Sequence, residues 1–335
     1  MPGPEVTIAV DAMSGDRGCE PVVRAAESAV SENRALRIVL LGRRAILEAF
    51  LVREHDRIEV VDASQVVTMD ERPSHALRHK QGSSMAAALR MVAEGRADAC
   101  VSAGNTGALM AMGRSVLRTY PGIDRPAIVK RVPSFSTPTY VLDLGANVDA
   151  GAENLFQYAV MGSLMARAIE GIDRPRVALL NVGAEDVKGN EQVRLASHML
   201  ESQGAVHYIG YIEGDDLFRG VADVVVCDGF VGNIALKTGE GVAELLRDLI
   251  RLAFTRGWYG RLIGLLAAPL LKRLSRRMDP ALHNGASFIG LRGVVIKSHG
   301  NADTTGLIAA IRQACSEVEQ GIPKRLSESL DQIDF

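Results

Sequence analysis

Short apolar runs alternate with longer amphipathic runs along most of this chain of 335 residues. The runs at 6–10, 98–101 and 223–227 are short and mainly apolar, as buried strands are, and a polar turn follows each of them. Repeated alternation of strand and helix predicts an α/β fold of three layers, with helices on both faces of a mostly parallel sheet. We expect a single domain over residues 1–335, because 47% of the residues are hydrophobic and can fill a sizeable core.

Polar residues of the same few kinds follow five of the predicted strands. These strand ends are Asp11–Asp16, Ser102–Gly107, Asp143–Asn147, Asn181–Asn190 and Asp228–Asn233. Because parallel sheets gather their ligand-binding loops at the carboxyl ends of the strands, we expect the five ends to share one edge. The sequence therefore predicts a small-molecule site at that edge. After the last end a helix is expected to begin near Ile234, and residues 70–81 are expected to form a polar loop.

The turn Ser102-Ala103-Gly104-Asn105-Thr106-Gly107-Ala108 is the most informative of these ends. A glycine turn that opens a helix directs several backbone N–H groups to one spot, and the helix N-terminus adds partial positive charge there. Such a turn suits phosphate or a developing oxyanion. It is not a Walker A loop, because no Gly-Lys-Ser/Thr follows, and an ordinary βα turn is the alternative. Because four other predicted strands also end in such polar residues, a binding site is favoured over an ordinary βα turn.

Residues 250–278 differ from the rest of the chain and predict a protruding helical segment. They contain seven basic residues, no acidic residue and the only Trp, Trp258. Ile263, Leu266, Leu270 and Leu274 fall at helical spacing and form one apolar stripe. The uncharged stretch is too short to span a bilayer, which needs about 20 apolar residues. A helix lying in a membrane interface and a helical hairpin buried against a second copy or the sheet both remain open.

Charge and cysteine usage exclude several classes of protein. The formal net charge of −2 gives no global field for nucleic acid, and the four cysteines have no C-x-x-C spacing for structural zinc. The N-terminal residues have neither the basic region nor the apolar core of a secretory signal, so the expected location is the cytoplasm. Cys100 and Cys227 lie in apolar runs and are expected to be buried thiols.

Several ordered stretches together resemble the PlsX family of phosphate acyltransferases from bacterial phospholipid synthesis. They are Val10–Met13 with Gly15–Asp16, Ser102–Met110, Leu142–Asn147, Asn181–Glu191, Cys227–Gly241 and Gly293–Gly300, so the resemblance runs nearly end to end. The family's first loop usually has Gly where this chain has Ser14, and His283-Asn284-Gly285 departs from a usual glycine pair. Neither change removes a charged group, but Ser14 leaves open how closely the first loop approaches a ligand.

The resemblance implies that acyl-acyl carrier protein and inorganic phosphate are converted to acyl phosphate and free carrier protein. It implies a fold similar to those of phosphotransacetylases and of isocitrate and isopropylmalate dehydrogenases. It also implies a homodimer, peripheral association with the inner face of the cell membrane, and delivery of product to a glycerol-3-phosphate acyltransferase. No metal and no cofactor is implied beyond the phosphopantetheine arm of the carrier.

Because phosphate is the nucleophile in that reaction, the protein must bind a dianion beside a thioester and stabilise the oxyanion. From residue type and loop position we expect catalytic roles for Lys188, Asn233, Asp228 and Asp11. The residues expected to bind phosphate or substrate are Gly104, Asn105, Thr106, Gly107, Asn147, Asn190, Gly232, Lys237 and His299. The residues expected to contact membrane or acyl chain are Trp258, Leu262, Ile263, Leu266, Leu270 and Leu274.

Three other functions can be weighed against this one. A short-chain phosphotransacetylase that uses coenzyme A shares the loop chemistry but does not need the basic, apolar segment at 250–278. A non-catalytic, membrane-associated scaffold would leave the five polar strand ends without a purpose. A dehydrogenase of a related fold needs a carboxylate cluster for a divalent metal, for which Asp11, Asp16 and Asp228 do not suffice. Arg251, Arg256 and Arg261 are candidates for docking an acidic carrier protein because of their charge.

Overall fold

The computed structural model describes the chain except for residues 1–4, 53–54, 136, 279, 332 and 334–335. Its strands are β1 (Val6–Asp11), β2 (Leu36–Gly42), β3 (Ile58–Asp62), β4 (Ala99–Ser102), β5 (Ala127–Val132), β6 (Thr139–Leu142), β7 (Arg176–Leu180), β8 (His207–Ile212), β9 (Val224–Val226), β10 (Ala286–Ile289) and β11 (Val294–Lys297). Its helices are α1 (Glu20–Glu32), α2 (Arg44–Phe50), α3 (Pro73–His79), α4 (Ser84–Ala93), α5 (Thr106–Leu117), α6 (Ala152–Glu170), α7 (Glu191–Gln203), α8 (Gly229–Thr255), α9 (Gly257–Met278), α10 (Thr304–Glu319) and α11 (Ile322–Leu330), with short 3-10 turns η1 (Gly214–Phe218) and η2 (Pro280–His283).

The described strands form one sheet of eleven, in the order β3-β2-β1-β4-β11-β10-β5-β6-β9-β7-β8. Seven of the ten neighbouring pairs are parallel, and the three antiparallel pairs, β11–β10, β10–β5 and β5–β6, lie together in the middle. The predicted α/β fold with a mostly parallel sheet is therefore confirmed.

The antiparallel strands correct the expectation that the five polar strand ends share one edge. Strands β1, β4 and β11 run in one direction, whereas β6, β9 and β7 run in the other. The carboxyl ends of the two sets consequently lie at opposite edges of the sheet. The pattern of apolar residues reports which segments are strands, but it carries no information on their direction.

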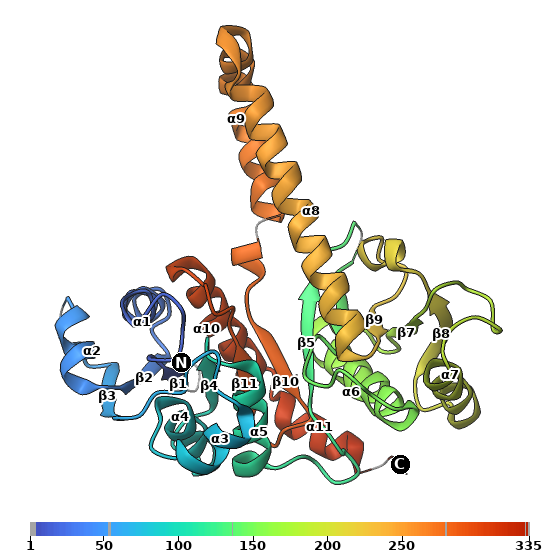
Figure 1. Cartoon of the computed structure of the whole chain (residues 1–335), viewed down its shortest axis with the longest axis horizontal. Helices are drawn as coiled ribbons and strands as arrows, with labels where there is room; N and C mark the ends of the chain where they lie inside the picture. The colour runs from blue at the N-terminus through green and yellow to red at the C-terminus, as the bar shows by residue number, and fades with distance from the viewer. Residues whose placement is uncertain (1–4, 53–54, 136, 279, 332, 334–335) are drawn as a thin grey trace.

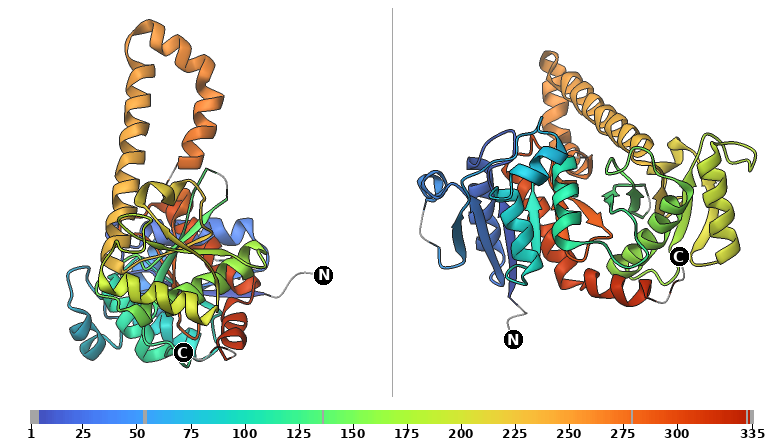
Figure 2. Two further views of the ribbon diagram at one scale, coloured as in Figure 1. Left: turned by 90° about the vertical axis from the view of Figure 1, so that its right-hand side faces the viewer. Right: turned by 60° about the horizontal axis from the view of Figure 1, so that its bottom comes forward.

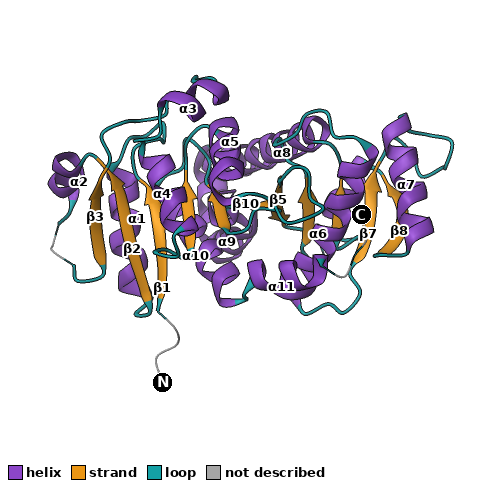
Figure 3. Cartoon of the chain, turned by 90° about the horizontal axis from the view of Figure 1, so that it is seen from below, coloured by secondary structure: helices purple, strands orange, loops and turns teal. Residues whose placement is uncertain are grey.

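Helices cover both faces of the sheet, as Figure 3 shows. Alternate residues of β1 point to different cores, because Ala9 packs with the side chains of α4 and α5, whereas Ile8 and Val10 pack with those of α1 and α10. In the other half of the sheet, α6 packs against β6, β9 and β7, while α7 and α11 pack against α6. The chain thus has the three layers that the alternation of strand and helix predicts.

Helices α8 and α9 form a hairpin that projects away from the sheet (Figures 1 and 2). The segment at 250–278 forms the end of α8 and all of α9. Large apolar side chains are exposed along the hairpin, with Trp258 and Leu266 each 76% exposed and Leu270 72% exposed. The Leu274 side chain lies outside the described residues. Among the described helices, none is long and apolar enough to cross a membrane.

Two helices begin where the sequence did not place them. Residues 70–81 were expected to form a loop but contain α3, which begins at Pro73, a residue that suits the first helical position. Helix α8 begins at Gly229 instead of near Ile234, because the Asp228 carboxylate accepts hydrogen bonds from the N–H groups of Phe230 and Val231, both at 2.9 Å. Residues 229–233 are therefore helical and not part of a loop.

Candidate active site

Asp11, at the end of β1, lies at the centre of a buried hydrogen-bond network. Its carboxylate accepts from the Ser84 hydroxyl at 2.6 Å and from the Ser102 hydroxyl at 2.7 Å. The Ser102 oxygen in turn accepts from the N–H of Gly104 at 3.1 Å. Both Asp11 oxygens are thus engaged by the protein, so that Asp11 positions the turn after β4.

The turn after β4 keeps only part of its polar surface free for a ligand. Asn105 caps α5, since its Oδ1 accepts from the Ala108 N–H at 2.9 Å and its amide donates to the carbonyls of Met69 and Glu71. The backbone N–H groups of Thr106 and Gly107 belong to the first turn of α5, where no carbonyl of the helix can accept from them. These two groups are the donors that the turn offers to an anion.

A chain of charged side chains connects β5, α8 and the loop after β11. Lys130 of β5 donates to one oxygen of Glu240 at 2.9 Å, and Lys237 donates to the other at 2.8 Å. The Lys237 ammonium also lies 3.0 Å from Nε2 of His299. One carboxylate therefore faces two ammonium groups, and the cluster of Lys130, Lys237, Glu240 and His299 carries a net positive charge.

The pKa values in this cluster follow from burial and charge. Burial raises the pKa of Glu240, but the ammonium groups of Lys130 and Lys237 outweigh burial and hold that pKa below its usual value. Burial lowers the pKa of His299, and the positive charge of Lys237 lowers it further. At neutral pH the Glu240 carboxylate is therefore ionised and the His299 imidazole is neutral.

A second group of predicted residues lies where β6 meets the start of α8. The buried Asp143 carboxylate accepts from the backbone N–H groups of Ile128 and Ala146 and from both nitrogens of Asn147. The Asn147 amide also donates to the Pro126 carbonyl at 2.8 Å, so its donors serve the protein interior. Burial raises the pKa of Asp143 in spite of these hydrogen bonds.

The first turn of α8 packs tightly on this end of β6. A side chain at Gly232 would overlap the Asp143 carbonyl oxygen, and the Gly232 N–H donates to the Asp228 carbonyl at 2.9 Å within the helix. The backbone donor that the sequence placed at Gly232 is therefore not available to phosphate. The side chain of Asn233, the next residue, is exposed and lies near Gly145.

The loop between β7 and α7 carries the remaining predicted residues. Lys188 is 45% exposed and pairs with Glu185 at 2.7 Å, a hydrogen bond that raises the Lys188 pKa. Asn190 caps α7 through a bond from the Val193 N–H at 2.9 Å. A cavity of about 450 Å³ lies next to this loop, and its lining includes Asn190 and Asp228. Lys188 is the basic residue of this loop, and its ammonium group lies at the surface.

Helix α8 connects the two groups of site residues. Asn233, Lys237 and Glu240 are spaced by four and three residues, so they lie on one face of the helix. Lys130 and Glu240 were not identified from the sequence as residues of the site. The one local signal was the spacing of three residues between Lys237 and Glu240. Their meeting depends on the position of α8 over β5, which the sequence pattern does not give.

Comparison with known proteins decides the family. A family model described as "Fatty acid synthesis protein" matches residues 6–325. A phosphate acyltransferase of Marinobacter nauticus is 65% identical over 328 residues, which are 98% of this chain and 96% of that protein. The chain belongs to the PlsX family of phosphate acyltransferases. A phosphate acyltransferase of Pseudomonas putida, a further relative, is 52% identical over 330 residues, 97% of this chain and 98% of its own.

Solved structures share the fold of this PlsX-family chain at low sequence identity. A phosphotransacetylase from Streptococcus pyogenes has a TM-score of 0.63 at 18% identity, covering 95% of both chains. A 4-hydroxythreonine-4-phosphate dehydrogenase from Klebsiella pneumoniae has a TM-score of 0.55 at 14% identity, covering 95% of this chain and 98% of its own. The expected likeness to phosphotransacetylases and to dehydrogenases is thus confirmed for the fold.

Membership of the PlsX family confirms that the chain is an acyltransferase of lipid synthesis. The roles given to individual residues stay predictions. Cys100 and Cys227 are buried free thiols, as expected, and burial raises the pKa of both. In the part of the chain that the structure describes, no group of three or more His, Cys, Asp or Glu side chains is placed to hold a metal ion.

Proposed function

We propose that this enzyme transfers the acyl group of acyl-acyl carrier protein to inorganic phosphate, giving acyl phosphate and free carrier protein. A phosphate oxygen attacks the thioester carbonyl, the carbon–sulfur bond breaks, and the thiol of the phosphopantetheine arm leaves with a proton. The observation that carries the proposal is the net positive cluster around Lys237 on the face of α8 that also holds Asn233. Such a cluster suits a dianionic nucleophile, which needs no Ser or Cys nucleophile from the protein.

Each part of the site then has a task. The N–H groups of Thr106 and Gly107, together with Lys237 and His299, hold phosphate in the orientation for attack. The Asn233 amide donates to the thioester oxygen as it becomes an oxyanion, and Lys188, on the loop between β7 and α7, adds positive charge. Asp11 acts by positioning, because the hydroxyls of Ser84 and Ser102 engage both of its oxygens. Asp228 positions the first turn of α8 through Oδ1, which accepts from both N–H groups there.

The acyl donor distinguishes this reaction from that of a phosphotransacetylase. We expect the purified enzyme to consume acyl-carrier thioesters at a much higher kcat/KM than the matching coenzyme A thioesters. The assay follows free thiol release from both donors at the same phosphate concentration. Equal or better use of coenzyme A would favour the phosphotransacetylase, and inertness toward both donors would favour a scaffold.

In this proposal, the α8–α9 hairpin holds the enzyme at the inner surface of the cell membrane. Its exposed Trp258, Leu266 and Leu270 suit insertion at the headgroup level, and basic residues such as Arg251 and Arg273 favour anionic lipid. A product made there is delivered directly to the downstream glycerol-3-phosphate acyltransferase. Leu266→Glu with Leu270→Glu should abolish sedimentation with anionic liposomes, whereas unchanged binding would rule out the anchor.

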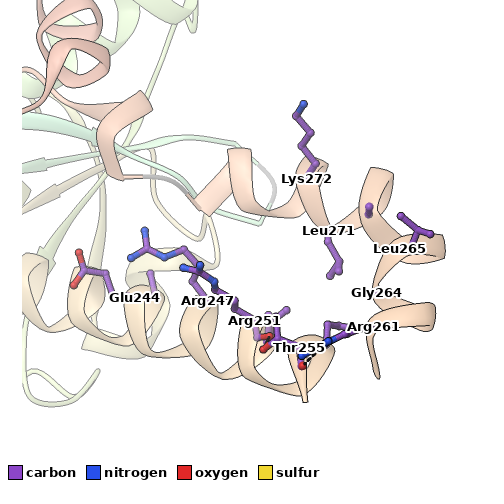
Figure 4. A pocket seen from close by; sticks show the side chains of 13 residues that line it. Glu244, Arg247, Arg251, Thr255, Arg261, Gly264, Leu265, Leu271 and Lys272 are labelled. Atoms are coloured by element: carbon purple, nitrogen blue, oxygen red, sulfur yellow. Dashed lines mark hydrogen bonds between the residues drawn. The ribbon is translucent and has the colours of Figure 1, made fainter. Parts of the chain in front are cut away.

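The hairpin also offers surfaces for protein partners. A cavity of about 620 Å³ between α8 and α9 is lined by apolar side chains, by Glu244 and by four basic residues, Arg247, Arg251, Arg261 and Lys272, as Figure 4 shows. These arginines suit the acidic carrier protein, and the exposed Leu245 and Leu249 of α8 suit a second copy in a homodimer. Arg251→Glu should raise KM for acyl-carrier protein several-fold. Sedimentation velocity of the wild type tests separately whether the enzyme is a dimer. An unchanged KM or a monomer would contradict the respective assignment.

A further inference from the structure

Lys297, the last residue of β11, is a mostly buried cation with an unusual set of partners. It pairs in register with Ser102 of β4, which in turn pairs with Asp11 of β1. Its ammonium group therefore enters the turn after β4, where it lies 3.4 Å from the Ala103 carbonyl and also contacts the Ser298 carbonyl. Both partners are neutral backbone oxygens that cannot balance its charge.

No carboxylate of the described residues lies within 4.0 Å of the Lys297 ammonium. Lys130 provides the contrast, since its side chain is only 12% exposed but pairs with Glu240 at 2.9 Å. A mostly buried ammonium is costly unless an anion compensates it, so a position of this kind suits a ligand that brings negative charge.

A second polar group at the same turn has no hydrogen-bond partner among the described residues. The buried Ser14 hydroxyl has no hydrogen-bond partner within the described structure. Ser14 lies against Gly104, since a Cβ added there would be 2.5 Å from the Ser14 Cβ. An ammonium without a paired carboxylate and an unsatisfied hydroxyl thus flank residues 103–104, next to the N–H groups of Thr106 and Gly107. Groups of this kind match the oxygens of a phosphate.

We propose that Lys297 is the ammonium that binds a phosphoryl oxyanion at the turn between β4 and α5. This inference rests on the proposed function, which supplies two sources of that chemistry: inorganic phosphate and the phosphodiester of the carrier arm. Lys237 of α8 lies near Lys297, because its ammonium contacts His299, which follows Lys297 by two residues. The two lysines thereby neutralise a dianion beside the α5 N-terminus.

The charges around Lys297 predict how binding depends on pH. Burial lowers the pKa of Lys297 to about 8, the carboxylates of Asp16 and Asp11 oppose that shift, and the Lys237 charge adds to it. Because the free ammonium loses its proton near pH 8, KM for phosphate should rise as the pH increases above 8. Arginine keeps its charge over that range, so Lys297→Arg should flatten the rise.

The test compares Lys297→Met, Lys297→Arg and the wild type, with Lys324→Met on the exposed face of α11 as the charge-matched control. Lys297→Met should raise KM for phosphate roughly 10- to 100-fold, the range expected for a lost bond to a charged group. A rise in KM for acyl-carrier protein alone would assign the anion to the carrier arm. Unchanged values of both, in a variant whose circular dichroism matches the wild type, would overturn the inference.

Direct binding separates this inference from the proposed function. Titration of the wild type and of Lys297→Met with inorganic phosphate, followed by calorimetry, does not require turnover. Weaker binding by the variant supports Lys297 as the anion ligand even if the wild type forms no acyl phosphate. Equal binding by both proteins, together with normal acyl phosphate formation by the variant, would refute the role of Lys297 and leave the proposed function intact.

Discussion

Glu317 of α10 offers a prediction whose size follows from the structure. Its side chain is almost fully buried, accepts from the Ser287 hydroxyl at 2.9 Å and from the Gln313 amide at 2.8 Å, and has no cation among these partners. Burial raises its pKa from 4.5 to about 7. The folded protein therefore binds a proton at this site more tightly than the unfolded chain does. Its stabilising contribution is complete below pH 4.5 and is lost as the pH rises through 7.

The magnitude follows from that shift. Each pKa unit corresponds to about 1.4 kcal/mol, so ionisation of Glu317 removes on the order of 3 kcal/mol of stability by pH 8. Glu317→Gln keeps a neutral side chain of the same shape, whose amide can still bond to Ser287 and Gln313. The variant should therefore be more stable than the wild type at pH 8 and nearly equal to it at pH 5.

Urea denaturation at pH 5 and pH 8, followed by far-ultraviolet circular dichroism, measures both values. Glu328→Gln on α11, where the carboxylate is 64% exposed, is the matched control and should leave the pH dependence unchanged. If Glu317→Gln loses as much stability between pH 5 and pH 8 as the wild type does, the assignment of this proton to Glu317 is refuted.

Three further substitutions test the packing and the chemistry of the site. Gly232→Ala should destabilise the fold by about 2 kcal/mol or more, because its Cβ would overlap the Asp143 carbonyl. Gly241→Ala in the same helix, where the added Cβ meets open space, should be neutral or slightly stabilising. Equal effects of the two substitutions on thermal unfolding would contradict the packing argument. The side chain of Asp11→Asn can accept only one of the two serine hydroxyl bonds. The substitution should lower the free energy of unfolding, measured by chemical denaturation, by about 2 kcal/mol and should also lower kcat. An unchanged free energy of unfolding would exclude the network. Lys188→Ala should lower turnover roughly 100-fold in a folded protein, and near wild-type turnover would remove Lys188 from the site.

The sequence predicted the local parts of the site well. The buried strand before the turn and the glycine turn that opens a helix depend on neighbouring residues, and local patterns report them, but the cap at Asn105 was predicted as a ligand donor instead. The same reasoning placed Asn190 and Asp228 at strand ends, but it did not show that their oxygens cap helices. A cap and a ligand donor use the same residue types, so the composition of a loop cannot separate the two uses.

The parts that the sequence did not predict depend on long-range geometry. The apolar runs of β5 and β6 identified strands but not their antiparallel pairing, and β10 was not predicted as a strand. The expectation of one shared edge for the polar ends was therefore wrong. Lys130 and Glu240 are separated by 110 residues and meet only because α8 passes over β5. Lys297 is one basic residue among many in the sequence, and only its register with Ser102 shows where its charge lies.

Incubation of the pure enzyme with long-chain acyl-carrier protein, with and without inorganic phosphate, tests the central claim most directly. Mass spectrometry follows the acyl-carrier protein, the free carrier and the acyl phosphate. The account predicts that free carrier and acyl phosphate form together, in equal amounts, and only when phosphate is present. Release of free carrier without acyl phosphate, or at the same rate in the absence of phosphate, would contradict phosphate as the nucleophile.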